Sequence, residues 1–126
     1  MAYTPDRPQN EASLQCATAS IGASPAAGSC VATNAGQIQR VFASAGGTTT
    51  GTISVSVQIN NGSDITNGLL TIAAGSGSRP ASVLEFQSNI GTGAVYVNEG
   101  DCIVFTPSLG GGSAIPGSFG CVIRTL

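Results

Sequence analysis

The sequence contains no histidine, lysine or tryptophan, and charged residues make up only 8% of its 126 positions. Histidine is the commonest general base and metal ligand, so its absence argues against catalytic triads, Cys-His dyads and zinc hydrolase sites. The only cations are four scattered arginines, Arg7, Arg40, Arg79 and Arg124. Isolated cations do not form the basic stripe that nucleic acids or anionic membranes attract. We therefore expect no nucleic acid, membrane, metal or cofactor as a partner.

The few carboxylates do not suggest an active site either. Glu99 and Asp101 flank Gly100, a spacing typical of a solvated turn rather than of an acid/base pair. Asp64 stands near two asparagines, but a single carboxylate lacks the charge of a calcium loop. The glycine run at 110–112 opens no helix and is not a phosphate-binding loop. The sequence thus predicts a protein that is not an enzyme.

The first residues, MAYTPDRPQNEAS, lack the basic and apolar regions of a secretory signal. No apolar run is long enough to span a bilayer. We therefore expect the chain to be made in the cytoplasm, whatever its final location.

Glycine and small or β-branched residues dominate what is present. The chain has 18 glycines and a net charge of −2. Each ordered glycine costs roughly 0.5–1 kcal/mol more conformational entropy than alanine. A surface with so few charges is also poorly protected against association. Both features favour a protein that gains stability in an assembly, where neighbours add contacts.

The clearest strand pattern runs from Ile53 to Ile59, where apolar and polar residues alternate. Gln37–Ser44 predicts a second strand, and the glycine-rich segment Ala45–Gly51 between them predicts a hairpin. The last strand is expected at Phe119–Leu126, with Phe119, Cys121, Ile123 and Thr125 on the predicted dry face, although Thr125 weakens the pattern. Further short strands are expected at Leu14–Ser20, Ser29–Thr33, Leu69–Ile72, Val83–Phe86, Ala94–Val97 and from Ile103 through Phe105 to a stop at Pro107.

Eight or nine short strands without a helix predict an all-β fold, specifically a jelly-roll-like antiparallel β-sandwich or small barrel. Residues 13–126 would form this single domain. Residues 1–12 would form an extended arm, because Pro5 and Pro8 favour extended backbone. The arm would be either a frayed terminus or a segment that lies across a neighbouring subunit.

Four cysteines, Cys16, Cys30, Cys102 and Cys121, have no C-x-x-C spacing that would indicate a zinc or redox motif. One interpretation is that they are buried free thiols that fill the core. The other is that two disulfides form late, Cys16–Cys30 and Cys102–Cys121. The first would join the strands of a hairpin centred on Ala23, and the second would join the strands that flank the triple-glycine loop.

The segments AGQIQRVFASAGG, TISVSVQINNGSDITNGLLTIAAGSG and VYVNEGDCIVFTPSLGG, followed by a closing strand, resemble small virion proteins of tailed bacteriophages. The resemblance is to head decoration or cement proteins and covers about residues 35–126. It rests on a strand that opens with A-G-x-I, a strand that ends in an N-G turn, an apolar T-I strand and a V-x-x-G-D turn. The four cysteines and the proline-containing arm depart from that pattern.

This resemblance implies a structural role on the virion, at the exterior of an icosahedral head. The partner would be the major capsid protein, and the chain would act as a homo-oligomer, commonly a trimer, that clamps adjoining capsid subunits. The best candidates for capsid contact are then in the arm: Tyr3, Pro5, Arg7 and Pro8.

Two other interpretations remain. The first is a carbohydrate- or receptor-binding β-sandwich module of a phage fibre or spike, although aromatic residues for sugar stacking are few. The second is a small hydrolase that uses Glu99 and Asp101, for which neither a histidine nor a pocket signature exists.

Overall fold

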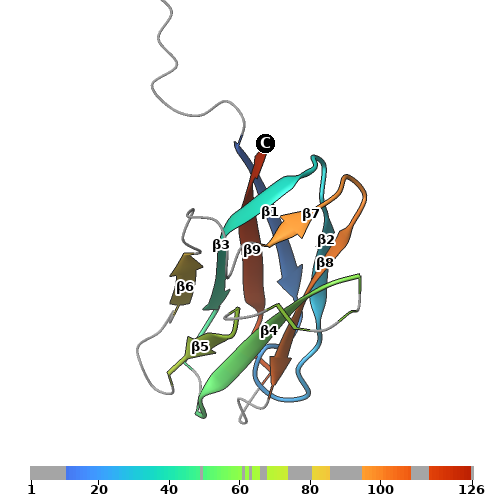
Figure 1. Cartoon of the computed structure of the whole chain (residues 1–126). Coiled ribbons are helices and arrows are strands. Elements are labelled where there is room, and N and C mark those ends of the chain that lie inside the picture. Colours follow the sequence, from blue (N-terminus) through green and yellow to red (C-terminus); the bar gives the residue numbers. More distant parts are fainter. Residues whose placement is uncertain are drawn as a thin grey trace, which may run out of the picture.

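The computed structural model describes residues 11–48, 50–60, 62, 64–65, 68–73, 81–85, 95–108 and 114–125, with the backbone alone for 81–85. These residues form nine β-strands (Figure 1). The strands are β1 (Glu11–Thr18), β2 (Gly28–Val31), β3 (Gly36–Ala45), β4 (Ile53–Ile59), β5 (Leu70–Ile72), β6 (Ala81–Glu85), β7 (Tyr96–Val97), β8 (Cys102–Ser108) and β9 (Gly117–Thr125). Within the described part of the chain, no helix is long and apolar enough to cross a membrane.

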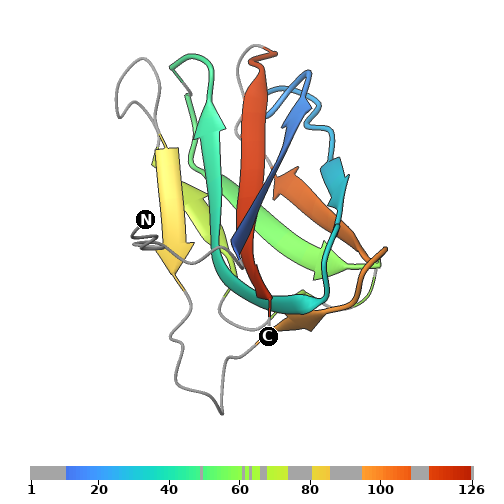
Figure 2. The ribbon, with the colours of Figure 1, turned by 90° about the horizontal axis from the view of Figure 1, so that it is seen from above.

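The strands form two antiparallel sheets that face each other (Figure 2). The first sheet has the order β1-β9-β3-β6, and β7 also pairs with β3. The second sheet has the order β2-β8-β4-β5. The first sheet thus has five strands and the second has four, and the chain crosses repeatedly from one sheet to the other, as in a jelly roll. The predicted all-β, jelly-roll-like sandwich is therefore confirmed.

The predicted hairpin of β3 and β4 is wrong, although both strands exist. β3 pairs with β9 and β6, whereas β4 pairs with β8 and β5 in the opposite sheet. Each strand has one apolar face, and packing the two sheets face to face buries both faces at once. The intervening glycine-rich segment crosses from sheet to sheet, and the Gly46 amide donates a 2.7 Å hydrogen bond to the Pro116 carbonyl.

The pairing of β1 with β2 is also absent, because β1 pairs with β9 and β2 pairs with β8. Likewise β8 and β9 lie in different sheets and do not flank a hairpin loop. Strand β8 continues through Pro107, which pairs with Val55, instead of stopping there. Strand β2, on the other side of β8, begins at Gly28 opposite Phe105 and does not reach Pro107. Pro107 therefore has a strand on one side only, where proline is tolerated.

The core lies between the sheets. Ile53, Val55 and Val57 are at most 1% exposed, as the alternation predicted. Phe119, Cys121 and Ile123 of β9 are also fully buried, so the predicted dry face of the last strand is confirmed. Both sheets thus turn one face inward and leave the other as a surface.

Candidate functional site

A row of four polar side chains crosses one end of the first sheet. Glu11 of β1 lies opposite Arg124 of β9, Arg124 opposite Gln37 of β3, and Gln37 opposite Tyr96 of β7. Directly opposed residues on antiparallel strands project from the same face. Their neighbours in sequence, such as Ile123, fill the core. We call these four residues the outer row, because they project away from the core.

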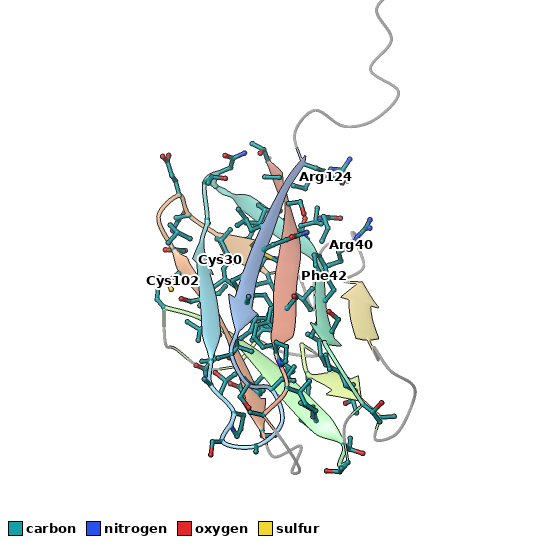
Figure 3. All side chains as sticks on the ribbon, turned by 180° about the vertical axis from the view of Figure 1, so that it is seen from behind. Cys30, Arg40, Phe42, Cys102 and Arg124 are labelled. Carbon is teal, nitrogen blue, oxygen red and sulfur yellow. The ribbon has the colours of Figure 1, made fainter. Side chains whose placement is uncertain are left out.

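Local irregularities place Arg40 beside this row. The register between β3 and β9 shifts between Ile38 and Arg40, so the strand contains a bulge there. The extra residue keeps Gln37 and Arg40 on the same face, and Figure 3 shows Arg40 and Arg124 at the same end of the sheet. Gly36 allows β3 to approach β9 closely, because a Cβ at this position would collide with the carbonyl oxygen of Arg124 in β9.

The outer row combines an aromatic ring with hydrogen-bond donors. Tyr96 is 54% exposed and is one of three large hydrophobic side chains that are exposed among the described residues. Gln37 is only 5% exposed, and its Nε2 has no hydrogen-bond partner among the described residues. Buried amide groups are normally paired, and an unpaired one costs free energy. The Arg124 guanidinium adds charged donors in a planar fork. The row is therefore suited to a partner that supplies acceptor oxygens and covers the ring.

An apolar patch adjoins the row on the same face. The ring of Phe42 lies over Gly120, where any Cβ would collide with it and would come within 2.8 Å of the Leu14 carbonyl oxygen. Val122, the next outward residue of β9, is half-buried. This patch lies between the outer row and the far end of the sheet.

The arm residues predicted to contact a capsid, Tyr3, Pro5, Arg7 and Pro8, lie outside the described residues. Strand β1 already begins at Glu11, so the last two residues assigned to the arm belong to the sheet. Residues 1–10 are consequently joined to the chain at Glu11, the first member of the outer row. The sequence analysis missed Gln37 and Tyr96, because their proximity depends on the order of the strands.

All four cysteines are free thiols. Cys16 lies opposite Phe119 and Cys30 opposite Ile103, so both face the core side of their sheets. Cys102 lies opposite the exposed Val31 and therefore faces outward. The structure thus brings Cys16 and Cys30 together, whereas the side chains of Cys102 and Cys121 project from different faces.

The three inward thiols form a connected cluster. Hydrogen bonds with Cys121 and then with Cys16 lower the pKa of the Cys30 thiol, against the opposing effect of burial. The interaction with Cys30 and burial raise the pKa of the Cys121 thiol. Burial, followed by the proximity of Cys30, raises the pKa of Cys16 to about 12. Cys30 is therefore the member of the cluster that ionises most readily.

The remaining candidate carboxylates have structural contacts. Asp101 accepts hydrogen bonds from the Asn98 amide at 2.8 Å and from Nδ2 of Asn60 at 3.0 Å, and these bonds lower its pKa. Asp64 accepts a 2.8 Å hydrogen bond from Nε2 of Gln58. Across the described residues, no group of three or more His, Cys, Asp or Glu side chains is arranged to hold a metal ion.

A scan against protein-family models matched none, and a search of curated proteins found no relative. The functional interpretation therefore rests on the residues themselves, on the jelly roll and on the outer row.

Proposed function

We propose that this chain is a structural virion protein that binds the outer surface of a phage capsid and stabilises contacts between major capsid subunits. The observation that carries the proposal is the outer row, which lies at the point where residues 1–10 join β1. An arm and a sheet face that meet at one place can bind two neighbouring capsid subunits, one through each part.

The residue types in the outer row support a protein partner. Tyrosine and arginine are enriched among residues that dominate the free energy of protein–protein binding. A capsid loop that covered Tyr96 would bury its exposed ring. The guanidinium of Arg124 would bind a carboxylate of the capsid. Tyr3 and Arg7 of the arm, set in extended backbone by Pro5 and Pro8, would extend this contact.

The fold and composition are compatible with the proposal. Jelly rolls build many viral capsid proteins, although the fold also occurs in lectins and by itself defines no function. The low charge and high glycine content favour stabilisation by neighbours, and we propose a homo-oligomer, with a trimer as the first expectation. The protein would be made in the host cytoplasm and would end on the capsid exterior.

Co-sedimentation with phage heads stripped of accessory proteins tests the proposal. We expect saturable binding by a discrete oligomer, and weaker binding by Tyr96→Ala and by a chain that lacks residues 1–10. Leu69→Ala is the matched control, because Leu69 is 55% exposed and Tyr96 is 54% exposed, yet Leu69 lies outside the outer row. A monomer that does not bind heads would contradict the proposal.

A second candidate function is a carbohydrate- or receptor-binding module of a phage fibre or spike. A pocket of about 270 Å³ beside β4 and β5 favours it, because this pocket combines the Asp64 carboxylate, the Ser56 hydroxyl and the apolar side chain of Leu69. Sugars are bound by such combinations of polar groups and an apolar surface. The residues that line this pocket include no aromatic ring on which a sugar would stack. Binding on a glycan array that Asp64→Asn abolishes would favour this function over the capsid role.

A further inference from the structure

We propose that Cys30 is an oxidation site and that its sulfur forms a disulfide with Cys16, which joins the two sheets at one open edge of the sandwich. This inference does not depend on the capsid role. The sequence suggested two disulfides, Cys16–Cys30 and Cys102–Cys121. The proposal keeps only the first.

The strand order places the two thiols at the same open edge of the sandwich. β1 is an edge strand of the first sheet and β2 is an edge strand of the second. Cys16 lies opposite the buried Phe119 and Cys30 lies opposite the buried Ile103, so the two thiols point toward each other across the space between the sheets. The pKa of each thiol also responds to the other, so the two thiols lie close together. In Figure 3, Cys30 lies on the inner side of β2 and Cys102 at the outer margin of the molecule.

The position of Cys16 at the open edge favours it over Cys121 as the partner. Cys121 also contacts Cys30, but it is fully buried beneath the edge of the sandwich. Cys30 is partly exposed, so a disulfide reagent dissolved in water reaches it, and the partly exposed Cys16 lies at the same open edge, where the mixed disulfide with the small thiol forms. Cys102 projects from the other face of the second sheet, next to Val31, and has no part in the bond.

The chemistry requires an oxidant, and a small disulfide such as oxidised glutathione supplies it. The Cys30 thiolate attacks one sulfur of that disulfide, forms a mixed disulfide and releases one small thiolate. The sulfur of Cys16 then attacks the Cys30 sulfur and releases the second small thiol. The two protein thiols are oxidised, the small disulfide is reduced to two thiols, and the two protein protons pass to those thiols. The lowered pKa of Cys30 favours it as the first nucleophile.

The bond would close the segment from residue 16 to residue 30, which contains the whole connection, residues 19–27, between the two edge strands. A disulfide across a loop of about 15 residues constrains the unfolded chain enough to raise the melting temperature by roughly 10 °C in a domain of this size. Such a bond would stabilise a glycine-rich domain after it leaves a reducing compartment.

A tryptic map of the whole protein tests this assignment. Trypsin cleaves after Arg40 and Arg124, because Arg7 and Arg79 each precede a proline. Fragment 1–40 contains Cys16 and Cys30, and fragment 41–124 contains the other two cysteines. The protein is incubated with oxidised glutathione, unfolded in denaturant, alkylated and digested without reductant. We expect fragment 1–40 to resist alkylation and to be lighter by two hydrogen atoms, and fragment 41–124 to carry two alkyl groups.

Two variants make the result specific. Cys30→Ser should abolish the rise in melting temperature that the oxidant produces, whereas Cys102→Ser should leave it unchanged. If Cys30→Ser does not fold, Cys16→Ser provides the same test from the other side of the bond. A cross-link between fragments 1–40 and 41–124, or full alkylation of fragment 1–40 after oxidation, would overturn the proposal.

Discussion

The rings of Phe105 and Phe119 stack across the centre of the molecule, with their centroids 5.3 Å apart and their planes inclined by 5°. Phe105 belongs to β8 and Phe119 to β9, so the pair joins the two sheets. Gly28 of β2 lies opposite Phe105, and a Cβ there would come within 2.9 Å of Cδ2 of Phe119. The stack therefore depends on two large residues and on one residue without a side chain.

Phe119→Ala should lower the free energy of unfolding by about 3–5 kcal/mol, because it removes a fully buried ring and leaves a cavity between the sheets. Urea unfolding followed by circular dichroism measures the loss. Phe42→Ala is the control, because Phe42 is only half-buried on the outer face, and it should cost clearly less. Equal losses for the two variants would show that the stacked pair does not form the centre of the core.

Gly28→Ala should cost about 1–3 kcal/mol, because the added methyl group would press on the Phe119 ring and lie 3.2 Å from the Ala17 carbonyl oxygen. A smaller side chain at position 119 should relieve part of this pressure. In the Phe119→Leu background, the cost of Gly28→Ala should therefore fall, and a double-mutant cycle measures the difference. Strictly additive effects would contradict the contact between these two positions.

Val57→Asp should prevent folding, because it places an unpaired charge at a position that is 1% exposed. Ser56→Asp, one residue earlier on the outward face of β4, controls for the added charge and should retain cooperative unfolding. A soluble Val57→Asp protein that melts like the wild type would show that the register of β4 is wrong.

Asp101 should contribute to the pH dependence of stability. Its pKa is lower in the folded protein than the ordinary value of 3.8, because Asn98 and Asn60 donate hydrogen bonds to the carboxylate. A lowered folded-state pKa stabilises the fold above the unfolded-state pKa, and this contribution disappears as the pH falls through the folded-state value. The melting temperature of Asp101→Asn should therefore fall less steeply than that of the wild type as the pH is lowered through 3.8.

The control for this titration is Glu99→Gln, which removes one negative charge from the same turn and leaves the hydrogen bonds of Asp101 intact. If Asp101→Asn and the wild type lost stability in parallel through acid pH, the structural role assigned to the Asp101 carboxylate would be incorrect.

Gln37→Met should separate stability from attachment. The substitution removes the buried Nε2 that has no partner among the described residues, so the isolated protein should be as stable as the wild type or more stable by about 1–3 kcal/mol. Binding to heads should stay unchanged, because the buried Nε2 is out of a partner's reach and the substitution leaves Tyr96 and Arg124 in place. Gln15→Met, at an exposed position on the same face, is the matched control and should change neither property strongly. A destabilised Gln37→Met protein would indicate that the amide is already satisfied within the chain.

The sequence predicted individual strands well and their pairing poorly. Alternation in β4 and β9 identifies the dry face, because side chains of a strand point alternately to its two faces. The same alternation does not tell which strand lies alongside, and in this fold the neighbours are distant: Glu11 pairs with Arg124. A local hairpin of β3 and β4 was therefore the natural but incorrect expectation.

The candidate site was harder to predict for the same reason. Gln37 and Tyr96 are ordinary strand residues in the sequence, and only the pairing of β3 with β7 places them side by side. The orientation of the cysteines was equally hard to predict from the sequence. The pairing of β2 with β8 determines that Cys30 faces inward and Cys102 outward. The predicted arm residues lie outside the described residues, so their role stays a prediction.

The thermal stability of phage heads tests the central claim, a cement function, most directly. Heads stripped of accessory proteins are titrated with the protein, and the temperature at which they release their DNA is measured. The account predicts that this temperature rises with occupancy and reaches a plateau when binding saturates, and that Tyr96→Ala shifts the plateau to higher protein concentrations. Heads that are saturated with the protein but release their DNA at the same temperature as bare heads would contradict it.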